Sequence, residues 1–139
     1  MERRPINATV KTPAENFTGD VYLTPIFNGD AASRLFFGLV RFTPGARTNW
    51  HSHANGQLLQ CTDGLGLVVT RDGIVIRLRA GDTVWTPAGE EHWHGATAGN
   101  MMCHYAILEQ TPAGDATTWL EPVADAQYAA ANESGCETA

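Results

Sequence analysis

The 139-residue sequence is poor in basic residues and has no long hydrophobic segment. It contains 9 lysines and arginines against 15 acidic residues, a formal net charge of -6, and no basic cluster. The chain therefore lacks the counter-charge that a phosphate backbone or an anionic bilayer surface requires. Its apolar runs are far shorter than the roughly 20 residues of a membrane span, and no signal-peptide core follows the N-terminal arginines. We expect no nucleic-acid or membrane partner and a cytoplasmic location.

Cysteine is scarce as well. Cys61, Cys103 and Cys136 are odd in number and irregularly spaced, which indicates free thiols in a reducing compartment rather than a disulfide framework. The length leaves no room for a separate cofactor domain. We expect a single domain over residues 1–128, including an N-terminal arm, and a flexible tail over residues 129–139.

Short segments of alternating apolar and polar residues recur at close intervals, each bounded by glycine, proline, asparagine or aspartate. This spacing is typical of an all-β sandwich or barrel. Asp72-Gly73, inside VVTRDGIVIRLR, has the composition of a two-residue hairpin turn and predicts antiparallel strands. Only the stretch DATTWLEPVADAQYAAAN has helical composition, and Pro122 limits a short helical or irregular segment to the residues after it.

The segment RLFFGLVRF is apolar on both faces of a strand. One face carries Phe36, Gly38, Val40 and Phe42, and the other carries Leu35, Phe37, Leu39 and Arg41. A strand that is apolar on both faces is expected to be buried on both. One face would line a barrel, and the other would pack against a second subunit or, alternatively, under the N-terminal arm.

Four of the five histidines form two closely spaced pairs. Residues two apart on a strand point to one face, about 6.6 Å apart, so His51 and His53 converge, as do His92 and His94. A single histidine on an apolar strand is more often a hydrogen-bonded core residue. Two pairs together favour a metal site, because neutral imidazoles are common ligands of first-row transition metals. The fifth histidine, His104, lies in an apolar strand.

Gln57 follows the first pair and is interpreted as a ligand through its amide oxygen. Together with His51, His53 and His92 it would form an uncharged donor set that leaves a divalent ion its full charge. Such an ion resists oxidation to the trivalent state and polarises a bound oxygen strongly, which favours Lewis-acid chemistry over oxygen activation. The alternative is an ordinary strand amide outside the metal shell.

Two motifs built from glycine, proline and histidine surround these residues. The pattern G-x5-H-x-H-x3-E-x6-G matches GARTNWHSHANGQLLQCTDG, with Gln57 in place of glutamate. The pattern G-x5-P-x-G-x2-H-x3-N matches GDTVWTPAGEEHWHGA, with Ala96 in place of asparagine. In both motifs the chain resembles the cupin superfamily. The resemblance implies a jelly-roll β-barrel, commonly dimeric, with an ion near its centre, but cupins host many activities.

A narrower resemblance covers nearly the whole chain. The stretches FTGDVYLTPIF, PGARTNWHSHANGQ, GDTVWTPAGEEHWHGA and WLEPVADAQY look like the small bacterial cupin hydroxynitrile lyases, manganese enzymes that cleave (R)-mandelonitrile and related cyanohydrins. This resemblance implies one divalent ion per chain, manganese first, held by His51, His53, Gln57 and His92, with an active-site histidine at His104. Iron, nickel and zinc accept similar ligands. A homodimer or homotetramer acting on a small molecule is expected.

Cyanohydrin cleavage requires removal of the hydroxyl proton, stabilisation of the alkoxide and protonation of cyanide. The ion would lower the pKa of the substrate hydroxyl, His104 would serve as base and later as acid, and His94 would be a neighbouring group or a partner for cyanide. Alternatively, His104 is a structural core residue and His94 caps its turn. An apolar pocket for an aromatic aldehyde, or simply a core, is expected from Phe36, Val40, Phe42, Leu59, Met102 and Leu108.

Two other classes of function stay open. A metal-dependent dioxygenase would consume oxygen or prefer Fe(II) for activity. A non-catalytic, metal-dependent binder of small molecules would be unaffected in every property by His104→Ala.

Overall fold

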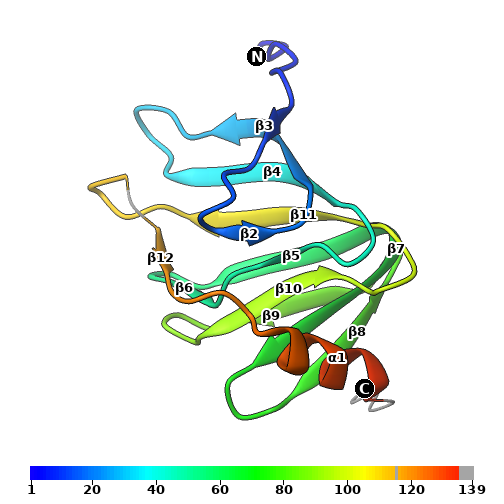
Figure 1. Cartoon of the computed structure of the whole chain (residues 1–139). Helices are drawn as coiled ribbons and strands as arrows, with labels where there is room; N and C mark the ends of the chain where they lie inside the picture. Colours follow the sequence, from blue (N-terminus) through cyan, green and yellow to red (C-terminus); the bar gives the residue numbers. More distant parts are fainter. Residues whose placement is uncertain (115, 135–139) are drawn as a thin grey trace.

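The chain folds into β-strands followed by one short helix (Figure 1), and the computed structural model describes residues 1–114 and 116–134. The strands are β1 (Val10–Lys11), β2 (Phe17–Thr18), β3 (Val21–Asn28), β4 (Leu35–Phe42), β5 (Arg47–Thr48), β6 (His51–His53), β7 (Gln57–Thr70), β8 (Val75–Arg79), β9 (Thr83–Thr86), β10 (His92–Ala96), β11 (Met102–Glu109) and β12 (Thr117–Trp119). The helix α1 (Asp125–Glu133) follows β12. Within the described ranges, no helix has the length and apolar character needed to cross a membrane.

The long strand β7 joins the two parts of a curled sheet. Its first half pairs with β9 and β11, and its second half pairs with β8 and β10. Between the halves, Gly64 has φ 80°, and a Cβ there would overlap the carbonyl oxygen of Met101, so the bend requires glycine. The order β1-β3-β4-β11-β7-β10-β5-β2, with β6 beside β10, confirms the predicted all-β barrel with a short C-terminal helix.

Apolar side chains that alternate along the strands fill the interior. Residues opposite one another on β4 and β11, such as Val40 and His104, point to the same side of the sheet. Full burial of one large apolar side chain contributes about 1.5–3 kcal/mol. The buried set includes Val21, Val40, Phe42, Leu59, Cys61, Val68, Leu78 and Met102.

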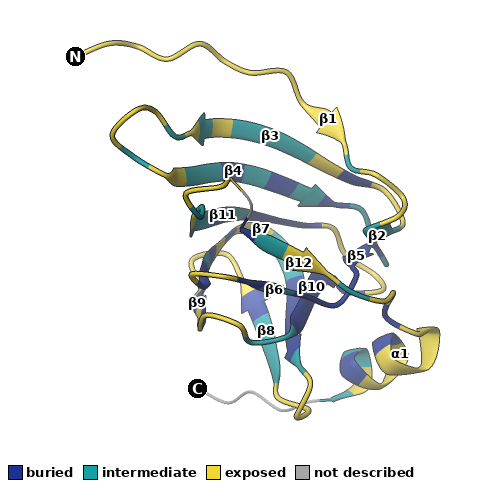
Figure 2. Cartoon of the chain, turned by 90° about the vertical axis from the view of Figure 1, so that its left-hand side faces the viewer, coloured by how far each residue is buried: buried dark blue, intermediate teal, exposed yellow. Residues whose placement is uncertain are grey.

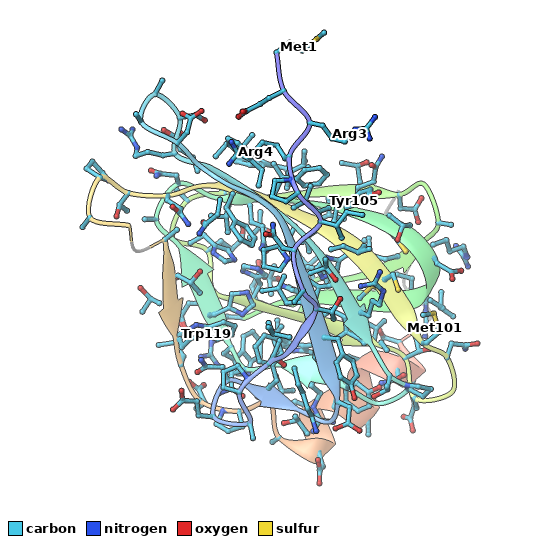
Figure 3. The ribbon with its side chains drawn as sticks, turned by 90° about the horizontal axis from the view of Figure 1, so that it is seen from above. Met1, Arg3, Arg4, Met101, Tyr105 and Trp119 are labelled. Atoms are coloured by element: carbon cyan, nitrogen blue, oxygen red, sulfur yellow. The ribbon has the colours of Figure 1, made fainter. Side chains whose placement is uncertain are left out.

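The second face of β4 is only half buried. Phe37 and Leu39 are partly exposed, and the Phe37 ring lies 4.9 Å from the ring of Tyr105 on β11. Figure 3 labels Tyr105. The N-terminal arm is exposed (Figure 2). Its strand β1 pairs with β3 and forms the edge of the sheet, and the Asn7 side chain donates a hydrogen bond to the Pro25 carbonyl of β3, 2.8 Å. The arm thus lies along the edge of the sheet and not over the half-buried face of β4. Packing of this face against a second copy of the chain stays a prediction.

Helix α1 packs on the outer side of the β7–β10 region and begins after Pro122. The side-chain oxygen of Gln127 accepts a hydrogen bond from the Ala124 amide, 2.9 Å, at its start. The Tyr128 hydroxyl donates to the Ala96 carbonyl, 2.7 Å. The helix runs through the boundary expected at residue 128, and its residue Ala131 is buried. The rest of the expected tail, residues 135–139, lies outside the described residues.

The hairpin between β7 and β8 is present, but its loop is longer than two residues. The Thr70 amide donates to the Ile74 carbonyl, 3.0 Å, which leaves residues 71–73 in the loop. Gly73 has φ 90°. A three-residue loop with glycine in the left-handed region is the next common hairpin connection, so Asp72-Gly73 marked the turn correctly but not its length.

Candidate metal centre

Three histidines from two paired strands meet inside the barrel. His51 and His53 lie on β6, and His92 on β10 is directly opposite His51. One ring nitrogen from each of the three lies within 4.8 Å of the other two. The side chains are 1%, 4% and 0% exposed, in that order. Because side chains alternate between the two faces of a strand, His51 and His53 on β6 point to the same side. Pairing of β10 with β6 then places His92 beside them.

Hydrogen bonds at Nδ1 hold these rings in place. His51 Nδ1 lies 2.9 Å from the Asn49 carbonyl, and His92 Nδ1 lies 2.9 Å from the Glu90 carbonyl. A carbonyl only accepts, so Nδ1 carries the hydrogen in both rings and Nε2 keeps its lone pair in the neutral form. His53 Nδ1 lies 3.1 Å from the Thr117 hydroxyl. Partners of this kind fix the orientation of metal-binding histidines.

Gln57, at the start of β7, extends the group to four side chains. Its Oε1 lies 3.4 Å from His92 Nε2, and the residue is 4% exposed. Because His92 Nδ1 holds that ring's hydrogen, two acceptors face each other here, which is unfavourable unless both bind a common cation. His53 Nε2 is also buried without a hydrogen-bond partner among the described residues. The donor set therefore fits one divalent transition-metal ion.

Burial keeps all these imidazoles neutral. Desolvation, and then the proximity of His92, lowers the pKa of His53 to about 4. Desolvation, followed by the neighbouring His92 and His53, lowers the pKa of His51 well below its ordinary value, and desolvation lowers the pKa of His92. Neutral imidazole is the form that binds metal, so near neutral pH no proton has to leave before an ion binds.

The two remaining histidines form a separate pair beside the first group. His104 Nε2 lies 3.0 Å from His94 Nδ1, and both side chains are buried. The outer nitrogens, His94 Nε2 and His104 Nδ1, are buried and lack hydrogen-bond partners among the described residues. Burial lowers the pKa of His104 to about 4, and burial together with the neighbouring His104 lowers the pKa of His94. Both rings are therefore neutral, and one N–H hydrogen lies between His94 Nδ1 and His104 Nε2.

Apolar residues surround this pair. The ring of Phe42 lies 5.8 Å from that of His94 and 5.3 Å from that of His104. Phe42, Val40, Leu59 and Met102 are buried in the core cluster. Phe36 and Leu108, which are opposite each other on β4 and β11, are partly exposed. The residues expected to line a pocket thus form an apolar wall whose exposure to solvent increases from the buried histidine pair toward one end of the sheet.

Sequence reasoning missed the residues that support the histidines from β12. Thr117 lies opposite His53, and Trp119 lies opposite His51. Asn49, whose carbonyl holds His51, is itself fixed by side-chain hydrogen bonds to the carbonyls of Glu15 and Leu120. Nothing local in the sequence points to these contacts, since most of them join segments more than 60 residues apart.

The fold and the histidine group together define the class. The family model for the cupin domain matches residues 38–108, half of the chain, and this protein belongs to that family. The chain is 43% identical over 121 residues to an (R)-mandelonitrile lyase of Granulicella tundricola. That alignment covers 87% of this chain and 92% of the relative.

Solved structures agree on the fold. A cupin-like protein of Thermotoga maritima superposes with a TM-score of 0.83 at 30% sequence identity, covering 96% of this chain and 98% of that one. The polyketide cyclase RemF of Streptomyces resistomycificus gives a TM-score of 0.69 at 16% identity, with 92% and 90% coverage. The second likeness bears on the fold alone, because one cupin barrel hosts unrelated chemistries.

Proposed function

We propose that the protein is a metal-dependent lyase that cleaves or forms cyanohydrins such as (R)-mandelonitrile. The supporting observation is the uncharged group of His51, His53, His92 and Gln57 in a chain 43% identical to a curated (R)-mandelonitrile lyase. These four side chains would hold one divalent ion, and we propose manganese. Bound there, the ion supplies Lewis acidity toward the substrate hydroxyl. A donor set without charge favours this chemistry over oxygen activation.

The paired histidines are proposed to move the proton. In cleavage the hydroxyl loses its proton, the C=O bond forms as the C–CN bond breaks, and cyanide leaves with the electron pair and takes up a proton. When His94 Nδ1 donates to His104 Nε2, His94 Nε2 holds a lone pair and can accept the substrate proton. The shared hydrogen can then pass to His104, which spreads the positive charge over both rings. Reversal of these shifts returns a proton to cyanide.

The apolar wall suits the carbon part of such a substrate. Phe42, Leu59 and Met102 are almost fully buried and present no charge beside the histidine pair. They exclude water and charge from the surroundings of the pair, which favours a substrate with an apolar carbon part over a charged one. We therefore propose aromatic aldehydes and their cyanohydrins as the substrate class.

Metal reconstitution under anaerobic conditions tests the proposal. Metal-free protein is loaded separately with Mn, Fe, Ni and Zn, and benzaldehyde release from racemic mandelonitrile is followed. We expect at least one ion, manganese first, to give cleavage without oxygen, and His51→Ala to abolish both metal loading and cleavage. The matched control is Ile74→Ala, a change at an exposed residue of the β7–β8 turn.

Two results would contradict the lyase. Activity that requires air would indicate a metal-dependent dioxygenase. Stoichiometric metal binding without cleavage under any loading would leave a metal-dependent binder of small molecules, particularly if His104→Ala changes nothing that is measured.

A further inference from the structure

Strand β12 places two side chains on the metal-binding face of β6. The strands are antiparallel, with Thr117 opposite His53 and Trp119 opposite His51. Directly opposed residues in such a pair point to the same face of the sheet. The hydrogen bond between the Thr117 hydroxyl and His53 Nδ1, 3.1 Å, agrees with this orientation. Trp119, two residues further along β12, therefore also faces the histidines.

The indole of Trp119 lies between a metal-binding imidazole and a phenyl ring. Its centroid is 4.8 Å from the His51 ring at an interplanar angle of 38°, and 5.3 Å from the Phe17 ring at 57°. Such tilted contacts between aromatic rings are favourable. Trp119, at the end of β12 (Figure 3), thus contacts one ring from β6 and one from β2 at tilted angles, and neither contact covers the whole indole, since the residue is 37% exposed.

Exposure to solvent differs strongly between the two neighbouring rings. His51 is 1% exposed, whereas Trp119 is 37% exposed. Its accessible surface is on the histidine side of β12, next to a ligand that is closed off from water. The part of the indole that Phe17 and His51 leave uncovered is thus an exposed apolar surface beside a candidate metal ligand, and such surfaces are common in binding sites.

We infer that the indole of Trp119, backed by Phe17, is the aromatic platform that holds the aryl group of the substrate while its oxygen lies at the histidine group. Trp119 is thus a specificity-determining residue that favours aryl over alkyl substrates. This inference rests on the proposed lyase function and names the part of the site that selects its substrate class. The ring is already fixed by Phe17 and His51, so stacking costs little conformational entropy.

Binding of two alcohols of similar shape tests the platform without relying on turnover. The dissociation constants of benzyl alcohol and cyclohexylmethanol are measured by calorimetry or ligand-observed NMR on metal-loaded protein, with metal content determined for every sample. We expect Trp119→Leu to weaken benzyl alcohol about threefold to tenfold, the range of an aromatic contact, and to leave cyclohexylmethanol within about twofold. Trp119→Phe should restore most of the preference.

Tyr22→Leu is the matched control, because Tyr22 is a 36% exposed aromatic residue on β3, next to the buried Val21 and so on the opposite face of the sheet. It should leave both constants unchanged. If Trp119→Leu does not fold, Phe17→Leu removes the support of the indole and should reduce the same preference. Equal losses for both alcohols, no loss for either, or no binding to wild-type protein would overturn the platform.

The same samples separate this inference from the reaction itself. Wild-type protein that prefers benzyl alcohol through Trp119 but never cleaves mandelonitrile supports the platform and contradicts the lyase. Wild-type protein that cleaves mandelonitrile while Trp119→Leu keeps the full aryl preference supports the lyase and contradicts the platform.

Discussion

The neutrality of the donor set can be tested by counting protons. Wild-type protein has four candidate ligands that carry no charge near neutral pH, because Gln57 does not titrate and burial lowers the pKa of His51, His53 and His92. With a pKa of about 4, His53 is protonated in about one molecule in a thousand at pH 7. Metal binding at pH 7 should therefore release essentially no protons.

Gln57→Glu should raise the number of protons released when the metal binds. A carboxylate oxygen at the position of Gln57 Oε1 would lie 3.4 Å from His92 Nε2. At this distance the attraction to a protonated imidazole is about 5 kcal/mol at an effective dielectric constant of 20, and about 1 kcal/mol at that of water. Because the site is buried, the larger figure is the closer guide, and it opposes the desolvation that keeps His92 neutral. We expect the metal-free variant to hold an extra proton, shared between the introduced carboxylate and His92, near neutral pH.

Calorimetric titration of Mn(II) in buffers of different ionisation enthalpy measures the released protons. We expect about zero for wild type and about one for Gln57→Glu, while Gln57→Ala, which removes the amide without adding charge, should stay near zero with weaker binding. The variant carboxylate should also slow cleavage, since it cancels half of the charge on the ion. Release of a full proton by wild type at pH 7, or identical counts for wild type and Gln57→Glu, would refute the reasoning.

Three further outcomes follow from the structure. Thr117→Val removes the hydroxyl beside His53 Nδ1 and should weaken metal binding about 10- to 100-fold in a chelator competition, with an unchanged melting temperature of the metal-free protein. The pKa of His104 is about 4 in the folded state, below its unfolded value, so between pH 6.5 and 4 the unfolded state binds more protons. The free energy of unfolding should therefore fall by about 3 kcal/mol for this group alone as the pH drops from 6.5 to 4. Urea titrations of metal-free protein measure this loss. We expect wild type to be a dimer or larger homo-oligomer in light scattering, and Leu39→Arg, on the half-buried face of β4, to shift it toward monomer; a monomeric wild type would contradict this.

The parts of the site that depend on strand alternation could be predicted from the sequence. His51 and His53 are two residues apart on β6, and that spacing alone sends both to one face. Residues joined by pairing of distant strands could not be predicted in this way. β12 has three residues and no alternating pattern, yet it supplies Thr117 and Trp119. A strand this short carries no periodic signal, and its register is fixed by contacts with β6.

The difference in the β7–β8 hairpin has a similar origin. Asp72-Gly73 is compatible with two loop lengths, and the choice is made by which residues of β7 and β8 pair. The register Val69↔Val75, closed by the Thr70–Ile74 hydrogen bond, leaves residues 71–73 in the loop and puts Gly73 at the position with positive φ. Local composition therefore located the turn, while cross-strand packing set its geometry.

One physical cause links the metal group with the proposed base. Desolvation lowers the pKa of His53 and of His104 alike to about 4, so the burial that leaves His53 free of a proton and able to bind an ion also keeps the His94–His104 pair neutral before it takes up the substrate proton. Loss of metal and protonation of the pair should therefore both occur on the acidic side of neutrality in wild type. A carboxylate at position 57 would act mainly on His92, which it faces, and not on the His94–His104 pair. In Gln57→Glu the pH dependence of metal binding should consequently move toward neutrality while the ionisation of the pair moves less, so the separation between the two acidic limits should differ from that in wild type.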